Sequence, residues 1–162
     1  MSAPKTIVTT PRDRETCITR EFNAPVRLVW DAHTKPDLVK RWLFGPDGWA
    51  LDVCTIDLRV GGKARYEMRR NGGPESMGWT DTYLEIAHQD HIVATEIFDE
   101  DWTGGETTVT LLFRAAGDKT SLEMTVLYAS QEARDGALQS GMTQGMEMGY
   151  ARLDTLFTEL AG

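Results

Sequence analysis

The stretch from Ser130 to Leu160 reads SQEARDGALQSGMTQGMEMGYARLDTLFTEL. Its apolar residues recur at intervals of three and four, which predicts one long amphipathic helix. Asp154 is expected on the opposite, solvent-facing side of this helix. The predicted buried stripe consists of Leu138, Met142, Gly145, Met146, Gly149, Leu153, Leu156 and Leu160.

Two glycines lie on the buried stripe of the predicted helix. A glycine inside a helix costs about 1 kcal/mol relative to alanine, so a reason is needed. Gly145 and Gly149 are one turn apart. Two interpretations stay open: the glycines leave room for a bound molecule, or they let a Trp or Tyr ring from the sheet press against the helix. Only the second predicts that Gly145→Ala would clash with protein atoms.

The composition indicates one ordinary globular domain. The chain has 162 residues, of which 41% are hydrophobic and 26% charged, with a formal net charge of −8. This charge disfavours nucleic acid and anionic membranes as partners, and no apolar run is long enough to insert into a bilayer. The only two cysteines, Cys17 and Cys54, are typical of buried free thiols in the cytoplasm, although a disulfide between them stays an alternative.

The chain before the helix has the pattern of a strand meander. Residues 1–14 are predicted to form a flexible tail, in which Thr6–Thr10 can add a short strand, and residues 15–162 a single domain. Glu15–Phe22 alternates as a strand. Asn23 is predicted to cap a short helix, and a second short helix follows it. Six further strands are predicted at 51–59, 63–70, 77–86, 92–98, around 109–113 and around 122–128. This order predicts an α+β fold, a curved antiparallel sheet with the long helix lying across it.

Arg20 is the polar residue that the alternation places on the inner face of a strand. A buried guanidinium needs a carboxylate or several carbonyl groups as partners. Asp57, Glu85 and Glu96 are the candidate partners in the sequence. Two interpretations stay open: a structural ion pair, or a contact to the polar head of a ligand.

The sequence contains no recognisable catalytic set, cofactor motif or metal-binding spacing. His33 is interpreted as a hydrogen-bonded core or rim residue, His88 and His91 as parts of a solvated turn, and the acidic segment 99–106 as a hairpin tip. Aromatic residues with a polar tip and flexible methionines suit an apolar pocket. The candidate ligand-binding residues are Arg20, Phe22, Tyr66, Met68, Trp79, Tyr83, Leu111, Met124, Met142, Gly145 and Met146.

Several short motifs occur in a characteristic order. They are REFNAP at 20–25, VWDA at 29–32, TKP at 34–36, RW at 41–42, DLRVGG at 57–62, GM at 141–142 and LDTL at 153–156. With these motifs the chain resembles, from Glu15 to Leu160, the START-like or Bet v 1-like SRPBCC superfamily, and within it the family named after the activator of Hsp90 ATPase homologue. The resemblance implies a helix-grip fold, in which the sheet and the C-terminal helix enclose a cavity.

The resemblance and the pocket candidates together set the functional expectations. The first is a cytoplasmic protein, of a kind found in stress responses, that binds a small hydrophobic molecule such as a lipid or an aromatic polyketide. A polyketide cyclase or dehydratase that uses the same cavity, with Arg20, Tyr66 or Tyr83 polarising a carbonyl group, is one alternative. A regulator of an Hsp90-type ATPase is another. No cofactor is expected, and a homodimer stays open.

Overall fold

The computed structural model describes residues 6–161, so only the last part of the predicted flexible tail 1–14 falls within the described residues. The strands are β1 (Ile7–Thr9), β2 (Glu15–Phe22), β3 (Trp49–Ile56), β4 (Lys63–Arg70), β5 (Ser76–Ala87), β6 (His91–Phe98), β7 (Thr107–Ala116) and β8 (Lys119–Leu127). The helices are α1 (Val26–Thr34), α2 (Pro36–Val39), α3 (Gln131–Gln139) and α4 (Met142–Ala161). The predicted α+β helix-grip architecture is confirmed.

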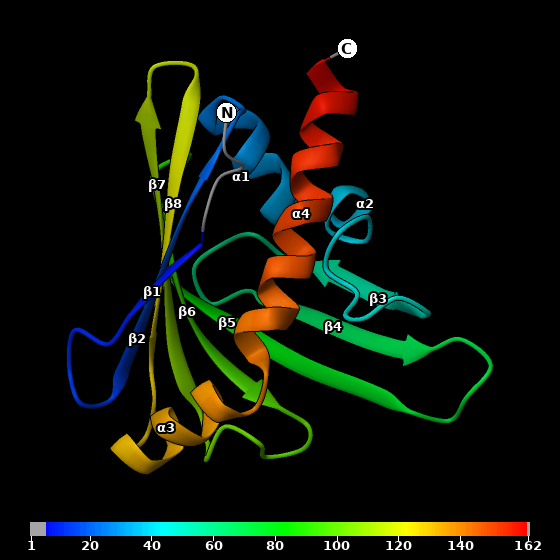
Figure 1. The fold of residues 1–162 in the computed structure, drawn as a ribbon, viewed down its shortest axis with the longest axis vertical. Coiled ribbons are helices and arrows are strands. Elements are labelled where there is room, and N and C mark those ends of the chain that lie inside the picture. The colour runs from blue at the N-terminus through cyan, green and yellow to red at the C-terminus, as the bar shows by residue number, and fades with distance from the viewer. Residues whose placement is uncertain (1–5, 162) are drawn as a thin grey trace.

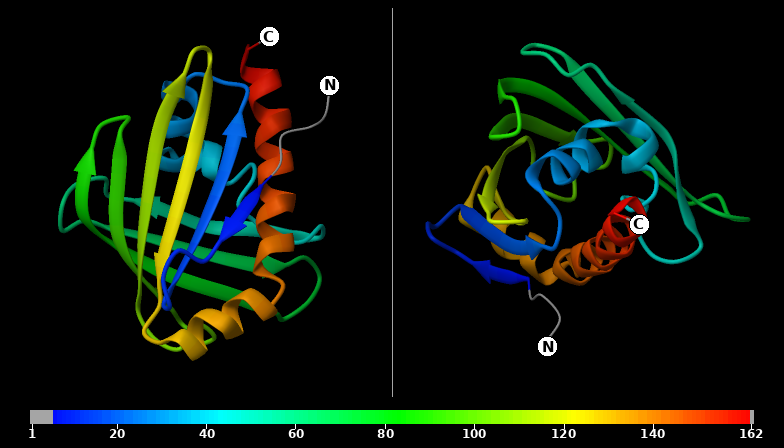
Figure 2. Two further views of the ribbon diagram at one scale, coloured as in Figure 1. Left: turned by 60° about the vertical axis from the view of Figure 1, so that its left-hand side comes forward. Right: turned by 90° about the horizontal axis from the view of Figure 1, so that it is seen from above.

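All eight strands form one antiparallel sheet in the order β1-β2-β8-β7-β6-β5-β4-β3. Strands β3 to β8 form a meander, and β2 closes the far side by pairing with β8 along its whole length. The sheet curves, and Figure 2 shows from above that α1, α2 and α4 lie within the curve. In Figure 1, α4 crosses in front of β4 and β5, while α3 lies at the lower end of the sheet.

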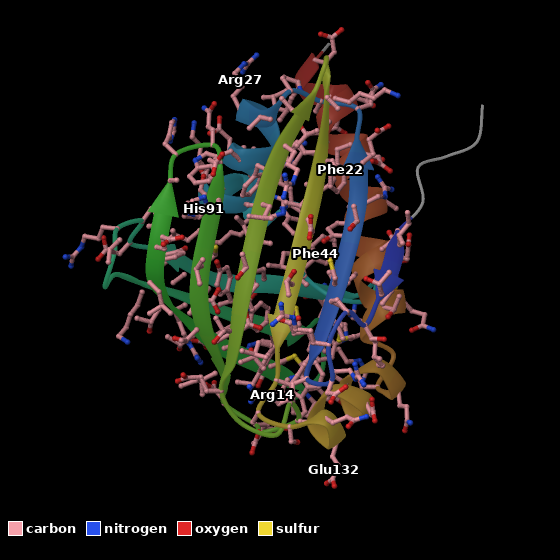
Figure 3. All side chains as sticks on the ribbon, turned by 90° about the vertical axis from the view of Figure 1, so that its left-hand side faces the viewer. Arg14, Phe22, Arg27, Phe44, His91 and Glu132 are labelled. Atoms are coloured by element: carbon pink, nitrogen blue, oxygen red, sulfur yellow. The ribbon has the colours of Figure 1, made fainter. Side chains whose placement is uncertain are left out.

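Period-two alternation explains which side chains of the sheet face the helices. In β2 the even-numbered residues from Thr16 to Phe22 are buried, and the odd ones are more accessible. In β4, Ala64 and Tyr66 are buried on the same inner face. Figure 3 looks onto the opposite, outer surface of the sheet, with the helices behind it. The inner face therefore carries the core of the protein.

The C-terminal segment forms two helices and not the single helix that we predicted. Gly141 separates α3 from α4 with a φ of +87°, a left-handed conformation that glycine adopts without steric cost. The Ser130 side chain caps α3 by accepting a hydrogen bond from the Ala133 backbone N–H. At the other end of the chain, the predicted Asn23 cap is wrong, because the N-cap residue of α1 is Pro25, which makes no side-chain cap.

Helix α4 contacts β2 through aromatic rings. The ring of Phe22, which is fully buried, packs edge-on against Tyr150 and Phe157, with centroid distances of 5.2 and 5.7 Å. Arg152 ties α4 to the loop after α2, because it donates to the Gly45 carbonyl at 2.7 Å and stacks on the Phe44 ring. The buried side of α4 consists of Gly149, Tyr150, Leu153, Leu156 and Phe157.

The buried side of α4 thus departs from the predicted stripe at both ends of the helix. Leu160 is 40% exposed, and Gly145 also faces solvent. Within residues 6–161, no helix combines the length and the apolar character needed to cross a membrane.

Candidate functional site

A small cavity lies between α1 and the middle of the sheet. Its volume is about 50 Å³. It is lined by His33, Tyr66, Asp81, Tyr83, Ile92, Ala94, Val109 and Leu111. An apolar cavity of about 150 Å³ is known to hold benzene, so this cavity in its present state has room for a polar group and a few water molecules only.

The register of the sheet places two carboxyl groups side by side on the inner face. Asp81 in β5 is directly opposite Glu96 in β6. The alternation of β5 brings Asp81 to the same face as the buried rings of Trp79 and Tyr83. A hydrogen bond joins the two carboxyl groups, which requires that one of them carries a proton. The pair is therefore a proton-sharing site inside the protein.

The electrostatics of this pair follow from its burial. Loss of solvation raises the pKa of Asp81 well above its ordinary value, and the neighbouring charge of Glu96 raises it further. Burial also raises the pKa of Glu96. Apart from the carboxyl group of Glu96, no hydrogen-bond partner is available to the buried Oδ1 atom of Asp81. An unsatisfied buried acceptor beside a cavity is rare in a structural core, and it marks this place as a candidate site.

Phenol and thiol groups surround the carboxyl pair. Burial raises the pKa of both Tyr66 and Tyr83. Cys54, opposite Tyr66 in the β3–β4 pairing, is a free thiol whose pKa burial raises to about 11. These groups are neutral at pH 7, and Cys54 is therefore a poor nucleophile.

His33 reaches the cavity from α1. Its Nδ1 lies 2.7 Å from the Val29 carbonyl oxygen and donates to it, which leaves Nε2 as an acceptor. Burial lowers the pKa of His33 to about 4, so the ring is neutral at physiological pH. The prediction of a hydrogen-bonded core or rim residue is confirmed, and the ring also lines the cavity.

A row of aromatic rings leads from the cavity to the surface. Tyr66 stacks on Trp79 with centroids 5.1 Å apart, and Phe98 follows at 5.5 Å from Trp79. Trp102 lies 5.0 Å from Phe98 and is 36% exposed. At this outer end a second hollow of about 160 Å³ is lined by Ser76, Met77, Gly78, Asp99, Glu100 and Trp102.

Arg20 belongs to another region of the interior. It is 3% exposed and makes a bidentate ion pair with Asp154 of α4, at 2.9 and 2.7 Å. None of the partners that we predicted, Asp57, Glu85 or Glu96, contacts it through an ion pair or a hydrogen bond, and Asp154 was wrongly expected on the opposite side of the helix. Arg20 also donates to the Glu21 carbonyl oxygen at 2.9 Å, so its position links β2 to α4.

The structure brings only some of the predicted ligand-binding residues together. Tyr66, Tyr83 and Leu111 line the cavity, and Trp79 stacks on Tyr66. Phe22 packs under α4, and the partly buried Met68, Met124, Met142 and Met146 pack against the same core. Asp81, Ile92, Ala94 and Val109 line the cavity and were missed. The alternation that identified Trp79 and Tyr83 would have identified Asp81, the residue midway between them.

The two helix glycines have different surroundings. A Cβ atom added at Gly149 would lie 3.3 Å from Cε3 of the Trp42 ring, so here a ring does press against the helix. A Cβ at Gly145 would meet nothing within 4 Å. The aromatic-contact interpretation therefore applies to Gly149, although the ring comes from the segment after α2 and not from the sheet. Among residues 6–161, no group of three or more His, Cys, Asp or Glu side chains is placed to hold a metal ion.

Comparison with proteins of known structure gives close matches over nearly the whole chain. A crystal structure of a protein from Rhodobacter sphaeroides is 30% identical, with a TM-score of 0.89 over 96% of this chain and 99% of the other. The protein Ms6760 from Mycobacterium smegmatis is 24% identical, with a TM-score of 0.83 over 96% and 99% of the two chains. An AHSA1-like protein from Aeromonas hydrophila is 20% identical, with a TM-score of 0.69 over 86% and 93%.

The sequence also matches a protein family directly. The profile of the family described as Activator of Hsp90 ATPase homolog 1-like protein matches residues 23–158, which is most of the chain. A comparison with curated proteins gave no match. The family match, together with the helix-grip fold that fits the SRPBCC superfamily, leads to one conclusion: the chain belongs to the Activator of Hsp90 ATPase homolog 1-like family.

Proposed function

We propose that this protein binds a small molecule with an apolar body and one polar group, and that the polar group enters the cavity at Asp81. The observation that carries the proposal is the buried Oδ1 of Asp81, a residue that lines the cavity; this atom has no hydrogen-bond partner apart from the carboxyl group of Glu96. A ligand that hydrogen-bonds to this atom would remove the desolvation penalty of an unpaired buried acceptor.

The apolar body of the ligand needs more room than the cavity now offers. Met142 and Met146 of α4 are only partly buried and pack against the same cluster as Tyr66 and Trp79. Unbranched methionine side chains change conformation easily, so they can make room for a ligand of varying shape. This supports binding between α4 and the aromatic side chains of β4 and β5.

A ligand panel tests the proposal. Lipids, aromatic polyketides and flavonoids with one polar group each are added to the protein, and the melting temperature and Trp fluorescence are recorded. Binding to the folded state raises the melting temperature in proportion to ligand saturation. Native mass spectrometry of the freshly extracted protein detects a molecule that copurifies with it.

A cavity-filling variant locates the binding. Ala94 lines the cavity and is 5% exposed, so Ala94→Leu fills the cavity and should abolish the ligand-induced shift. Ala116→Leu, which adds the same atoms at an exposed position of β7, is the control and should bind as the natural protein does. The proposal is wrong if no molecule of the panel binds, or if Ala94→Leu binds as well as the control.

A further inference from the structure

Lys40 is the one cation whose charge acts on the groups around the carboxyl pair, and it acts on Cys54. The other titratable groups around the pair supply no positive charge. They are Cys54 of β3, Tyr66 of β4, Tyr83 of β5, His33 of α1, Tyr128 after β8, and Asp57, whose charge acts on Tyr83. Burial keeps the pKa of His33 at about 4, so its ring is uncharged at pH 7. Within residues 6–161, no Lys, Arg or His forms an ion pair with Asp81 or Glu96. Two buried carboxyl groups without a cation are an unusual arrangement, because buried charges are nearly always paired.

The same region is rich in hydrogen-bond acceptors. Asp81 Oδ1 is buried and unpartnered apart from the second carboxyl group of the pair, and it belongs to a residue that lines the cavity. His33 donates from Nδ1 to the Val29 carbonyl oxygen, and its Nε2 is therefore also an acceptor. The rings of Tyr66 and Tyr83, which line the cavity as well, present π-electron density to a cation. Apart from the tyrosine hydroxyl groups and the proton of the carboxyl pair, the lining of the cavity thus offers acceptors and π faces to a ligand.

Resting on the proposed function, we propose that the polar group bound at Asp81 and Glu96 is a protonated amine, so that the ligands of this protein are hydrophobic primary amines. An ammonium group has three donors and a positive charge, whereas a hydroxyl group has one donor and no charge. A ligand carboxylate would be repelled by the pair. An ammonium group also fits the small volume of the cavity, because its compact head enters while the apolar body stays among the rings and methionines.

Binding of an ammonium group changes the protonation of the pair. Without a bound cation, the raised pKa of Asp81 favours a state in which the two carboxyl groups hold one proton. When the cation enters, both carboxylates are stabilised in the ionised form and the shared proton leaves for the solvent. Each bound amine should therefore release up to about one proton at neutral pH, and the affinity should rise with pH until the pair is fully ionised.

Calorimetric titration with three probes of similar size tests the proposal. The probes are 2-phenylethylamine, 2-phenylethanol and phenylacetate, which share a phenyl ring and differ in the charge of the polar group. The amine should bind at least about tenfold more tightly than the alcohol, because hydrogen bonds to charged groups are the stronger ones, and phenylacetate should not bind. Titrations in phosphate and in Tris, which differ in ionisation enthalpy, measure the released proton.

Two variants tie the effect to the carboxyl pair. Asp81→Asn and Glu96→Gln keep the side-chain shape and should lose the preference for the amine and the proton release, while Asp118→Asn in the exposed β7–β8 turn should retain both. A melting curve verifies that each variant is folded. If the alcohol binds as tightly as the amine, or if Asp81→Asn keeps the preference, the ammonium assignment is wrong and the proposed binding function stands. If none of the three probes binds while a molecule of the ligand panel does, the assignment is wrong as well. If neither the probes nor the panel bind, both proposals fail.

Discussion

Two regions of the same interior are built on opposite principles. Between β2 and α4, Phe22 is enclosed by aromatic rings and the guanidinium of Arg20 is matched by both oxygens of Asp154. Between β5 and α1, the carboxyl group of Asp81 faces another carboxyl group and a cavity, with one oxygen atom unpartnered. The first region pairs its buried charge with an opposite charge of the same chain, although Arg20 Nε has no hydrogen-bond partner. The second region holds two carboxyl groups that form no ion pair with a cation among the described residues.

This difference indicates where stability and function reside. A packed aromatic cluster and a matched ion pair stabilise the fold and need nothing from outside. Unsatisfied polar groups in a cavity reduce stability, and proteins retain such groups mainly at binding or catalytic sites. The β2–α4 region therefore holds the fold together, and the cavity region is where a ligand would act.

The largest difference between the two regions should appear on truncation of core side chains. Phe22→Ala removes a fully buried ring and should lower the free energy of unfolding by about 3–5 kcal/mol, the usual range for such a truncation. Leu111→Ala truncates a side chain that is only partly buried and should cost only about 2 kcal/mol. Urea unfolding curves of both variants measure the two losses, and equal losses would contradict the comparison.

The next largest effect should be a pH dependence of the stability that comes from His33. The pKa of this histidine is lowered from 6.5 to about 4 in the folded protein, so between these pH values the unfolded chain takes up the proton more readily. The contribution of His33 to stability should therefore decrease as the pH falls from 6.5 to 4, by up to about 3 kcal/mol, against an opposite contribution from Asp81. His33→Gln, which cannot be protonated, should lack this slope, whereas Asp81→Asn should keep it. A slope that persists in His33→Gln would assign it to other groups.

Replacement of the Asp81 carboxyl group by an amide should stabilise the protein. Asp81→Asn ends the competition between two buried carboxyl groups and should raise the free energy of unfolding at pH 7 by about 1–2 kcal/mol. Because the folded-state pKa of Asp81 is raised above 3.8, the contribution of this group to the stability of the unmodified chain decreases as the pH rises through and beyond 3.8. The difference in the free energy of unfolding between Asp81→Asn and the unmodified chain should therefore grow as the pH rises. Thermal unfolding of both proteins between pH 4 and 8 measures this difference. A variant less stable than the natural chain would show that the carboxyl pair stabilises the fold.

The smallest effects concern the two glycines of α4. Gly145→Ala, with open space around its new methyl group, should stabilise the protein by about 0.5–1 kcal/mol. Gly149→Ala should lose this gain or reverse it, because the methyl group would press on Trp42. That ring is fixed by a hydrogen bond from its Nε1 to the Ala32 carbonyl oxygen at 2.8 Å. Thermal unfolding measures the change in melting temperature. A rise for Gly145→Ala and a fall for Gly149→Ala would support a close contact at Gly149 and none at Gly145.

Local periodicity was sufficient to predict most of the fold. Alternation in 15–22 and 63–70 correctly gave the strands and their buried faces, since side chains on a strand point to opposite sides in turn. Helical periodicity failed at Gly141, because the apolar pattern continues through this residue although its positive φ ends the helix. The helix was therefore taken as continuous, and its buried side was placed too far from Tyr150 and Phe157.

The partners of the charged residues could not be predicted in the same way. Arg20 was correctly predicted to be buried. Its partner Asp154 is 134 positions away, and the two residues meet only because α4 packs against β2. The pairing of Asp81 with Glu96 depends on the register of β5 and β6, which shifts at a bulge between Tyr83 and Glu85. Such contacts follow from tertiary structure, and a spacing rule cannot supply them.

The sheet is open, and its two edge strands, β1 and β3, are protected in different ways against pairing with another molecule. On one side β1, only three residues long, covers Cys17, Ile18 and Thr19 of β2. On the other side β3 is the outermost strand, and its pairing with β4 is interrupted by a bulge between Leu51 and Val53. A short strand and a bulge are both devices that hinder edge-to-edge pairing between molecules. Loss of residues 7–9 would uncover the backbone of β2, and the first consequence would be self-association of the protein through that edge.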